Sequence, residues 1–244
     1  MNEFILSNIL GIVAAFASLV GSLIVLSRKK ITTNFLFYFI SIGAGFVLAV
    51  SLIDIIPESL KLSVEAPLYI VIGFFIVHFF EHVVSSHFHF GEETHKEEIN
   101  KSTAWSILLA LTVHTFLDGV SIAAGFHVDI FLGSTIFIAV VLHKIPDGFT
   151  VASVMLASGR EKLGALAASL LLSFSTIAGC FWASTFTGLT PIILPISAGA
   201  FLHIAATDLI PEVVKKRKLS LSFTIFGGAL LYYFTRLVLM KFGI

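Results

Sequence analysis

GAGFVLAVSLIDIIPE, residues 43–58, is matched far along the chain by SAGAFLHIAATDLIPE, residues 197–212. Seven of the sixteen aligned positions are identical. The matching acidic residues are Asp54 and Glu58 in the first segment, and Asp208 and Glu212 in the second. A segment that recurs in this way indicates an internal repeat, and the kind of repeat depends on how the chain between the copies is arranged.

The composition indicates that this chain lies in a membrane. Of the 244 residues, 57% are hydrophobic and only 12% are charged, which is not the composition of a water-soluble domain. The formal net charge of zero leaves no basic excess for binding nucleic acid, and Cys180 is the single cysteine, so it has no partner for an internal disulfide. The sequence therefore predicts an all-α integral membrane protein that is embedded in the lipid bilayer.

Apolar runs of about 20 residues, long enough to cross a bilayer as helices, occur eight times. Their approximate bounds are 4–27, 33–56, 66–83, 102–125, 130–157, 162–185, 190–213 and 220–242. The one segment that has a soluble character is rich in His and Glu and covers about residues 83–101. We therefore predict a single transmembrane domain over residues 1–244, with one polar loop between spans 3 and 4.

Basic residues set the predicted orientation, because Lys and Arg in short loops stay on the cytoplasmic side. Eleven of them fall in the loops after spans 1, 3, 5 and 7, against Lys61 and Lys241 on the other side, while Lys144 and Arg236 lie inside spans. We therefore expect both termini outside and the His/Glu-rich loop in the cytoplasm. The N-terminus lacks the basic start of a cleaved signal, and the compact chain fits a prokaryotic inner membrane.

In this topology the two matching segments end spans 2 and 7, which run in opposite directions. The repeat is then inverted about an axis in the membrane plane and relates spans 1–3 to spans 6–8, an arrangement typical of transporters. It places Asp54 and Glu58 toward the outer mouth and Asp208 and Glu212 toward the cytoplasmic mouth, where they suit a cation path. A simpler interpretation is that the prolines beside these acids only end their helices and that the acids face water.

Two related hexapeptides, HTFLDG in span 4 and HKIPDG in span 5, place ionisable groups near the middle of consecutive spans. Because positions i and i+4 share one face of an α-helix, His114 with Asp118, and His143 with Asp147, each form a two-ligand pair. A charged group at mid-span costs on the order of 3 kcal/mol, so four at matched spacing argue for a function rather than for satisfied core residues. Imidazole with carboxylate suits zinc, iron(II), manganese, cobalt or nickel better than copper(I).

The polar loop carries further groups that can bind metal. His82, His87, His89 and His95 lie among four glutamates. Imidazoles and carboxylates on a flexible segment bind divalent metals weakly and in varying geometry, so we expect metal capture on the cytoplasmic side. The alternative is a solvated linker that happens to be polar.

Taken together, these features resemble the ZIP family of divalent-metal transporters. The resemblance covers the whole chain: eight spans, outward termini, the His-rich loop, the two hexapeptides, and the acidic Pro-Glu endings of spans 2 and 7. It implies a bundle of three, two and three helices, a homodimer, and metal moving into the cytoplasm, while the inverted repeat predicts alternating access. The residues that it implies as ligands are His114, Asp118, His143 and Asp147, with His203 and Asp208 along the path.

This resemblance makes a divalent metal the transported substrate rather than a cofactor, and it implies that the protein is not an enzyme. Zinc is the first choice, with Fe²⁺, Mn²⁺, Co²⁺ and Cd²⁺ as further candidates. The sequence has no glycine-rich phosphate-binding motif, so we expect no nucleotide partner.

The chain departs from the family pattern beside the predicted ligands. Many members have Asn after the span 4 histidine, an acid or amide after the span 5 histidine, and an acid in span 6, which together hold a second metal. This sequence has Thr115 and Lys144 at the first two positions and no acid in SLLLSFSTIAGC of span 6. We predict that the Lys144 ammonium replaces the second cation, pairs with Asp118 and Asp147, and leaves a site for one metal. The alternative is that Lys144 extends to the membrane surface.

Two other functions fit parts of the sequence. HFFEH in span 3 places His78, Glu81 and His82 at the spacing of zinc hydrolases, in which two histidines hold zinc and a glutamate activates water, although no third ligand is identifiable. The paired histidines and aspartates could also form the proton relay of a carrier for an organic solute.

Overall fold

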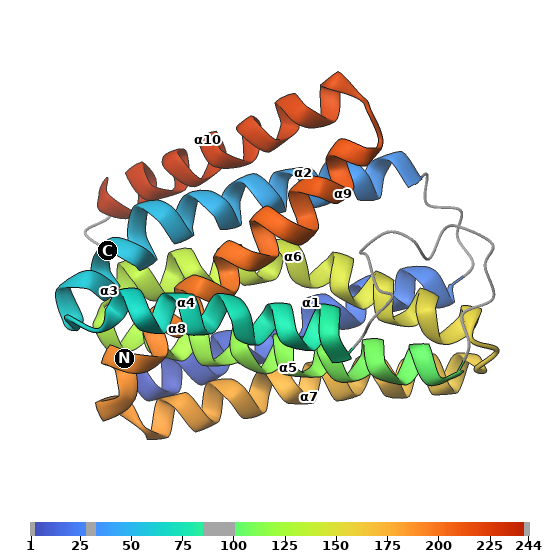
Figure 1. The fold of residues 1–244 in the computed structure, drawn as a ribbon, viewed down its shortest axis with the longest axis horizontal. Helices are drawn as coiled ribbons and strands as arrows, with labels where there is room; N and C mark the ends of the chain where they lie inside the picture. The colour runs from blue at the N-terminus through green and yellow to red at the C-terminus, as the bar shows by residue number, and fades with distance from the viewer. Residues whose placement is uncertain (1–2, 28–32, 85–100, 242–244) are drawn as a thin grey trace.

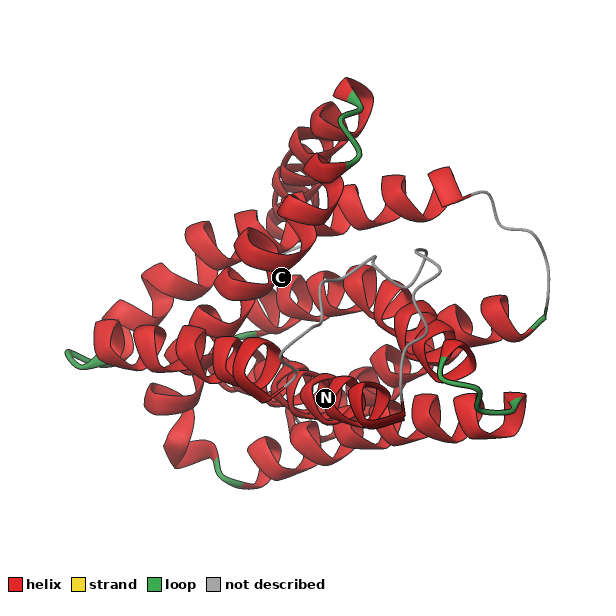
Figure 2. Cartoon of the chain, turned by 45° about the vertical axis from the view of Figure 1, so that its right-hand side comes forward, coloured by secondary structure: helices red, strands yellow, loops and turns green. Residues whose placement is uncertain are grey.

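The computed structural model describes the chain except for residues 1–2, 28–32, 85–100 and 242–244. Every regular element in the described part is helical (Figures 1 and 2). In chain order the elements are α1 (Glu3–Leu26), α2 (Thr33–Val50), η1 (Ser51–Ile55), α3 (Ile56–Leu62), α4 (Ala66–His78), η2 (Phe79–Val84), α5 (Lys101–Val128), α6 (Ile130–Ala157), α7 (Lys162–Thr185), η4 (Thr187–Leu189), α8 (Thr190–His203), η5 (Ile204–Leu209), α9 (Ile210–Lys215) and α10 (Leu219–Lys241).

Eight helical segments are long and apolar enough to cross a membrane, as the sequence predicts. The segments Ile130–Ala157 and Lys162–Thr185 have the predicted bounds. The second span continues to Leu62, beyond its predicted end at residue 56. The all-α class and the number of spans are confirmed, and the largest error in a boundary falls in the repeated segment.

That error has a local cause, which is shared by the two copies of the repeat. The π-helical turns η1 and η5 end two residues before Pro57 and Pro211, respectively. A proline has no N–H and displaces the carbonyl four residues earlier, and the wider π turn accommodates this defect without ending the helix. The helices continue through both prolines to Leu62 and Lys215, so the interpretation that these prolines end their helices is wrong.

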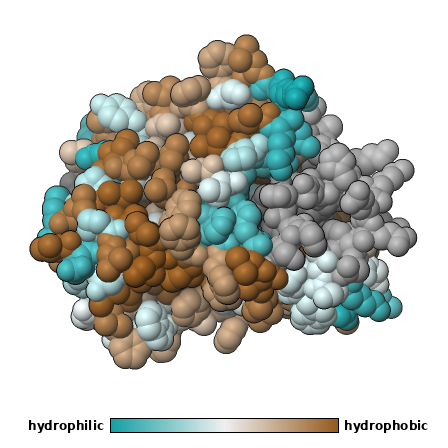
Figure 3. Space-filling model, in the orientation of Figure 1, coloured by the Kyte–Doolittle hydropathy of each residue, from teal (hydrophilic) through white to brown (hydrophobic). Residues whose placement is uncertain are grey.

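The bundle has two ends, which we name after the aspartates of the repeat. The Asp54 end carries α3, the start of α1 and the end of α10, and the Asp208 end carries α9 (Figure 1). Between them, α5 is largely buried, whereas few residues of α4 and α10 are fully buried. Apolar side chains dominate the face seen in Figure 3, and those of α10 include the exposed Phe223, Phe226 and Phe234. Such a surface is suited to lipid rather than to water.

Glycines bring α5 and α6 close to α7 and α1. A Cβ at Gly148 of α6 would overlap the carbonyl oxygen of Ser18 in α1, and one at Gly119 of α5 would overlap that of Thr176 in α7. The partner helices return the contact, because Gly21 of α1 lies against Ile145, and Gly179 of α7 lies against Phe116. Small residues allow backbones to approach closely in membrane bundles. At these positions the backbone of the neighbouring helix leaves no room for a side chain larger than that of glycine.

Glycines on both partners also form the close contacts of α2 with α10 and of α8 with α4. Gly45 of α2 lies against the carbonyl of Ile225 in α10, and Gly199 of α8 lies against the carbonyl of Ile70 in α4. The corresponding return contacts are Gly228 with Ile42, and Gly73 with Ile196. Residues of α2 therefore correspond to residues of α8 found 154 positions later, and residues of α4 to residues of α10 found 155 positions later. An inverted repeat predicts this exchange of partners, although the repeat remains a prediction.

Candidate metal centre

Four buried side chains from the middle of α5 and α6 point at a common position. His114 and Asp118 lie one turn apart on α5, and His143 and Asp147 lie one turn apart on α6. Each residue offers one ligand atom, and the four atoms lie within 4.8 Å of one another. The two pairs predicted from the hexapeptides therefore do face each other.

The separations between individual atoms suit a small metal ion. His143 Nε2 lies 3.2 Å from Asp118 Oδ1, and His114 Nε2 lies 3.5 Å from Asp118 Oδ2 and 3.6 Å from Asp147 Oδ2. Two ligand atoms that are each about 2.1 Å from a tetrahedral zinc ion lie roughly 3.4 Å apart. These three separations are close to the length of an edge of such a coordination shell.

A second hydrogen bond sets the orientation of one imidazole. Nδ1 of His143 lies 2.8 Å from the carbonyl oxygen of Ala139. Because a carbonyl oxygen only accepts, Nδ1 carries the proton and donates it, which leaves the lone pair of Nε2 directed at the site. Metal-binding histidines are typically held in this way by a carbonyl or carboxylate on the other ring nitrogen.

Lys144 is fully buried beside these groups. Its Nζ lies 2.8 Å from Asp118 Oδ2, so the interpretation in which the side chain reaches the membrane surface is wrong. Among the described residues, Asp118 is its only ion-pair partner within 4 Å, and the predicted pair with Asp147 is not formed. With neutral imidazoles, two aspartates and one ammonium leave one excess negative charge, which attracts a cation.

Glu81, which the sequence singled out only as part of HFFEH, connects this centre to a second group of residues that could hold a metal ion. Its Oε1 lies 3.6 Å from Nδ1 of His114, and its Oε2 lies 3.4 Å from Nδ1 of His203. Glu81 lies in the π-helical turn η2 and is buried. The carboxylate therefore bridges an imidazole of the metal centre and an imidazole of α8.

His203 is the centre of this second group. Its Nδ1 lies 3.5 Å from Asp208 Oδ2, and its Nε2 lies 3.4 Å from Nδ1 of His78. The rings of His78 and His82 are stacked with their centroids 4.5 Å apart. We call the five residues the Glu81 cluster; they are His78, Glu81, His82, His203 and Asp208. The third imidazole, which the sequence could not identify for HFFEH, is His203.

The other predicted path residues do not join either group. Asp54 is buried and its Oδ1 lies 3.3 Å from Nη1 of Arg236, a partner that the sequence did not suggest. Glu58 is paired with Lys61 at 2.7 Å. The buried Glu212 lies 3.4 Å from Lys215. Of the loop histidines, His82 belongs to the Glu81 cluster, whereas His87, His89 and His95 lie outside the described residues.

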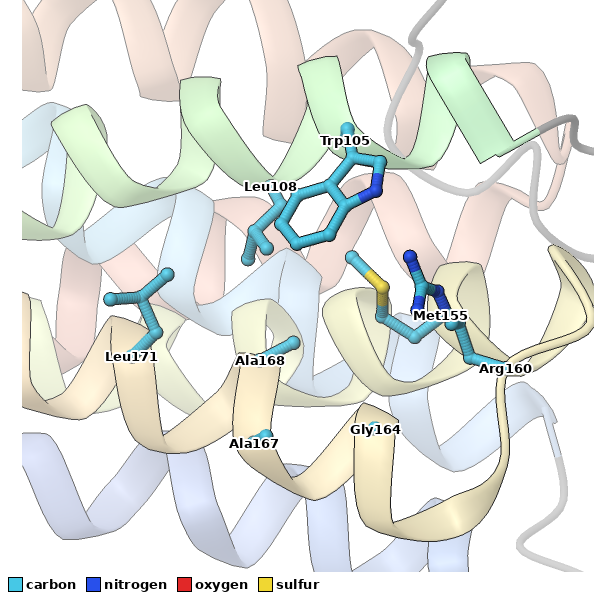
Figure 4. Close-up of a pocket in the computed structure, with 8 residues that line it drawn as sticks. All are labelled: Trp105, Leu108, Met155, Arg160, Gly164, Ala167, Ala168 and Leu171. Carbon is cyan, nitrogen blue, oxygen red and sulfur yellow. The ribbon is translucent and has the colours of Figure 1, made fainter.

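A pocket of about 320 Å³ between α5, α6 and α7 is separate from the metal centre (Figure 4). It is lined by Trp105, Leu108, Met155, Arg160, Gly164, Ala167, Ala168 and Leu171. Among these lining residues, Arg160 is the only charged one, and its Cζ lies 5.3 Å from the centroid of the Trp105 ring. The pocket contains none of the predicted ligands.

Fold and site together define an integral membrane protein with a buried cluster of imidazoles and carboxylates at mid-span. Residues 91–235, more than half of the chain, match the family model described as ZIP zinc transporter. The chain belongs to the ZIP zinc transporter family, as the resemblance of its motifs predicts.

Individual relatives agree with this assignment. Over 154 residues the chain is 30% identical to the "Zinc transporter ZIP13 homolog" of Drosophila melanogaster, which covers 58% of this chain and 43% of the relative. It is 29% identical over 158 residues to "Zinc transporter ZIP9" of Micropogonias undulatus, which covers 59% of this chain and 50% of the relative. For "Zinc transporter zipt-7.1" of Caenorhabditis briggsae, the identity is 30% over 122 residues, 47% of this chain and 31% of the relative.

The chain thus aligns with about a third to a half of the length of these relatives. All three are named as transporters, which agrees with the expectation that this protein is not an enzyme and that metal is its substrate rather than its cofactor. All three come from animals, so the prokaryotic inner membrane stays a prediction.

Proposed function

We propose that this protein transports a divalent transition metal, zinc foremost, across the membrane and into the cytoplasm. The observation that carries the proposal is the buried set His114, Asp118, His143 and Asp147, whose ligand atoms lie within 4.8 Å of one another at mid-span. Two imidazoles and two carboxylates form a ligand set that binds zinc well and that Fe²⁺, Mn²⁺, Co²⁺ and Cd²⁺ can share. Membership of the ZIP zinc transporter family supports the same substrate class.

The site holds one metal in this proposal. The Lys144 ammonium, 2.8 Å from Asp118 Oδ2, already places a positive charge beside the ligands, and a second divalent ion there would be repelled. Anomalous scattering from protein soaked with zinc should therefore give one strong peak between α5 and α6. Two peaks at full occupancy would contradict the single-metal site.

The Glu81 cluster gives the metal its route toward the Asp208 end. A metal that leaves His114 meets Glu81 and then His203, through separations of 3.6 and 3.4 Å between side-chain atoms. Asp208 and His78, which lie beside His203 in the Glu81 cluster, offer the next ligands. The excess of basic residues in the loops predicted at this end supports a cytoplasmic position for it, and the predicted inverted repeat supports alternating access as the mechanism.

The decisive experiment is uptake of zinc into proteoliposomes containing the purified protein. His143→Ala should reduce uptake roughly 100-fold or more, because even the loss of a residue that only orients a ligand costs about 10–100-fold in metal affinity. His127→Ala is the matched control, since His127 also lies on a buried helix but is bonded to Thr190 Oγ1 at 3.1 Å, away from the centre. Competition by the other divalent metals then ranks their preference.

Both alternative functions are addressed by the same preparation. Flux of an organic solute that needs no metal would favour the organic carrier over the metal transporter. The hydrolase interpretation gains a third imidazole in His203, yet the relatives are named transporters and we do not propose it. The homodimer implied by the family remains a further proposal, which cross-linking in membranes tests.

A further inference from the structure

The ion pair between Arg236 and Asp54 is the feature at the Asp54 end that the transport proposal leaves unused. Asp54 is 8% exposed, and its Oδ1 lies 3.3 Å from Nη1 of Arg236 on α10. The guanidinium also lies 3.4 Å from the hydroxyl of Tyr232, and its Cζ lies 5.8 Å from the centroid of the Phe131 ring. Arg236 therefore bridges α10, the repeated segment of α2–η1 and the start of α6.

This ion pair borders a pocket of about 200 Å³ at the Asp54 end. The pocket is lined by Ile53, Asp54, Pro57, Glu58, Lys61, Asp129, Phe131, Leu132 and Arg236. Two of its three carboxylates are occupied locally, because Glu58 binds Lys61 at 2.7 Å and Asp129 caps α6 by accepting from the Leu132 N–H at 2.6 Å. Asp54 is the carboxylate that is buried, and a guanidinium holds it.

The opposite end shows what the repeat places at the equivalent position. Asp54 corresponds to Asp208 in the repeated segments. The glycine contacts of α4 and α10 lie 155 residues apart, and the same count from Glu81, in the turn η2 that follows α4, reaches Arg236. Glu81 and Asp208 lie together with His203 in a group that can hold a metal. The repeat thus places a carboxylate beside Asp208 and a cation beside Asp54.

We propose that Arg236 is the resident cation of the outer mouth, which occupies Asp54 until an incoming metal displaces it. This inference rests on the proposed transport function. The pair suits such an exchange: it has one guanidinium nitrogen at 3.3 Å rather than a bidentate geometry, and the Arg236 side chain is 33% exposed. A divalent ion carries twice the charge and binds the same carboxylate. A monovalent ion competes less well, so the exchange also favours divalent over monovalent cations at entry.

The test is the KM for zinc added on the outside of proteoliposomes. Arg236→Gln removes the competing cation, so KM should fall about 2- to 5-fold, the range expected for a partly exposed ion pair. Asp54→Asn should raise KM, and Arg236→Gln should add nothing to Asp54→Asn, because both changes act through one carboxylate. Arg236→Lys keeps the charge and should stay near the wild-type KM.

Lys61→Gln is the matched control, because Lys61 is a second cation of the same pocket whose partner is Glu58. It should leave KM unchanged. Three results would overturn the proposal. The first is a fall in KM for Lys61→Gln equal to that for Arg236→Gln. The second is a full effect of Arg236→Gln in the Asp54→Asn background, and the third is an unchanged KM for Asp54→Asn alone. If the wild-type protein takes up no metal, the transport function itself fails and this inference fails with it. Wild-type uptake with an unchanged KM for Arg236→Gln removes only the inference.

Discussion

The two ends of the bundle have similar backbones and opposite chemistry. At each end a π-helical turn precedes a proline, an aspartate lies on that turn, and a glycine on the same span lies against a neighbouring helix. The Asp208 end adds the histidines and the glutamate of the Glu81 cluster, whereas the Asp54 end adds Arg236. In our proposal, this difference gives a path through one scaffold its direction. Side chains that could bind a metal lie at one end, and a cation that an incoming metal displaces lies at the other.

The shared scaffold can be tested by removing the same contact from each half. Gly45→Ala and Gly199→Ala each place a Cβ against a backbone carbonyl, of Ile225 and Ile70 respectively, which cannot move aside as a side chain can. Each change should destabilise the protein by about 3 kcal/mol or more, at the upper end of the range for overpacking. Thermal unfolding of the purified protein in detergent measures the effect.

Gly227→Ala is the control for these two variants, because a Cβ at Gly227 meets no atom within 4 Å. It should leave stability unchanged or raise it slightly, since Ala favours a helix over Gly. Strong destabilisation by only one of Gly45→Ala and Gly199→Ala would break the equivalence of the two halves.

A second prediction concerns the buried cation at mid-span and an exposed one at the Asp54 end. Lys144→Met removes the partner of a buried carboxylate and should cost about 3–5 kcal/mol. Lys61→Met breaks an exposed pair, in which the Lys61 side chain is 70% exposed, and should cost less than about 1 kcal/mol. Zinc should restore much of the stability of Lys144→Met, because a divalent ion can take the place of the ammonium. Equal losses for the two variants would mean that Lys144 does not neutralise the centre.

The third prediction separates entry from exit. Glu81→Gln should lower the maximal rate of zinc uptake about 10-fold, because the carboxylate between His114 and His203 no longer binds the metal as it leaves the centre. Its effect on KM should be small, in contrast to Arg236→Gln. Glu65→Gln, at an exposed position near the start of α4, serves as the control. A change in KM with an unchanged maximal rate would place Glu81 on the entry side and reverse the comparison.

The sequence predicted the parts of the centre that lie on single helices. His114 with Asp118, and His143 with Asp147, follow from the fixed spacing of an α-helix, and their depth follows from the apolar runs around them. The replacement of a family position by Lys144 correctly indicated a buried cation beside Asp118, although not the absence of a pair with Asp147. Glu81 and Arg236 were visible as ionisable residues within spans, but their partners lie on other helices.

The sequence by itself determined the number of spans, the class of fold and the two pairs of His and Asp that share a helix face, because apolar length and helical period are local properties of the chain. Only the tertiary structure decided that Glu81 joins His114 to His203 and that Arg236 holds Asp54, because these contacts depend on how closely and at what register separate helices pack. That register is set by glycines that meet backbone carbonyls of neighbouring helices. Periodicity along one helix carries no information about such contacts between helices.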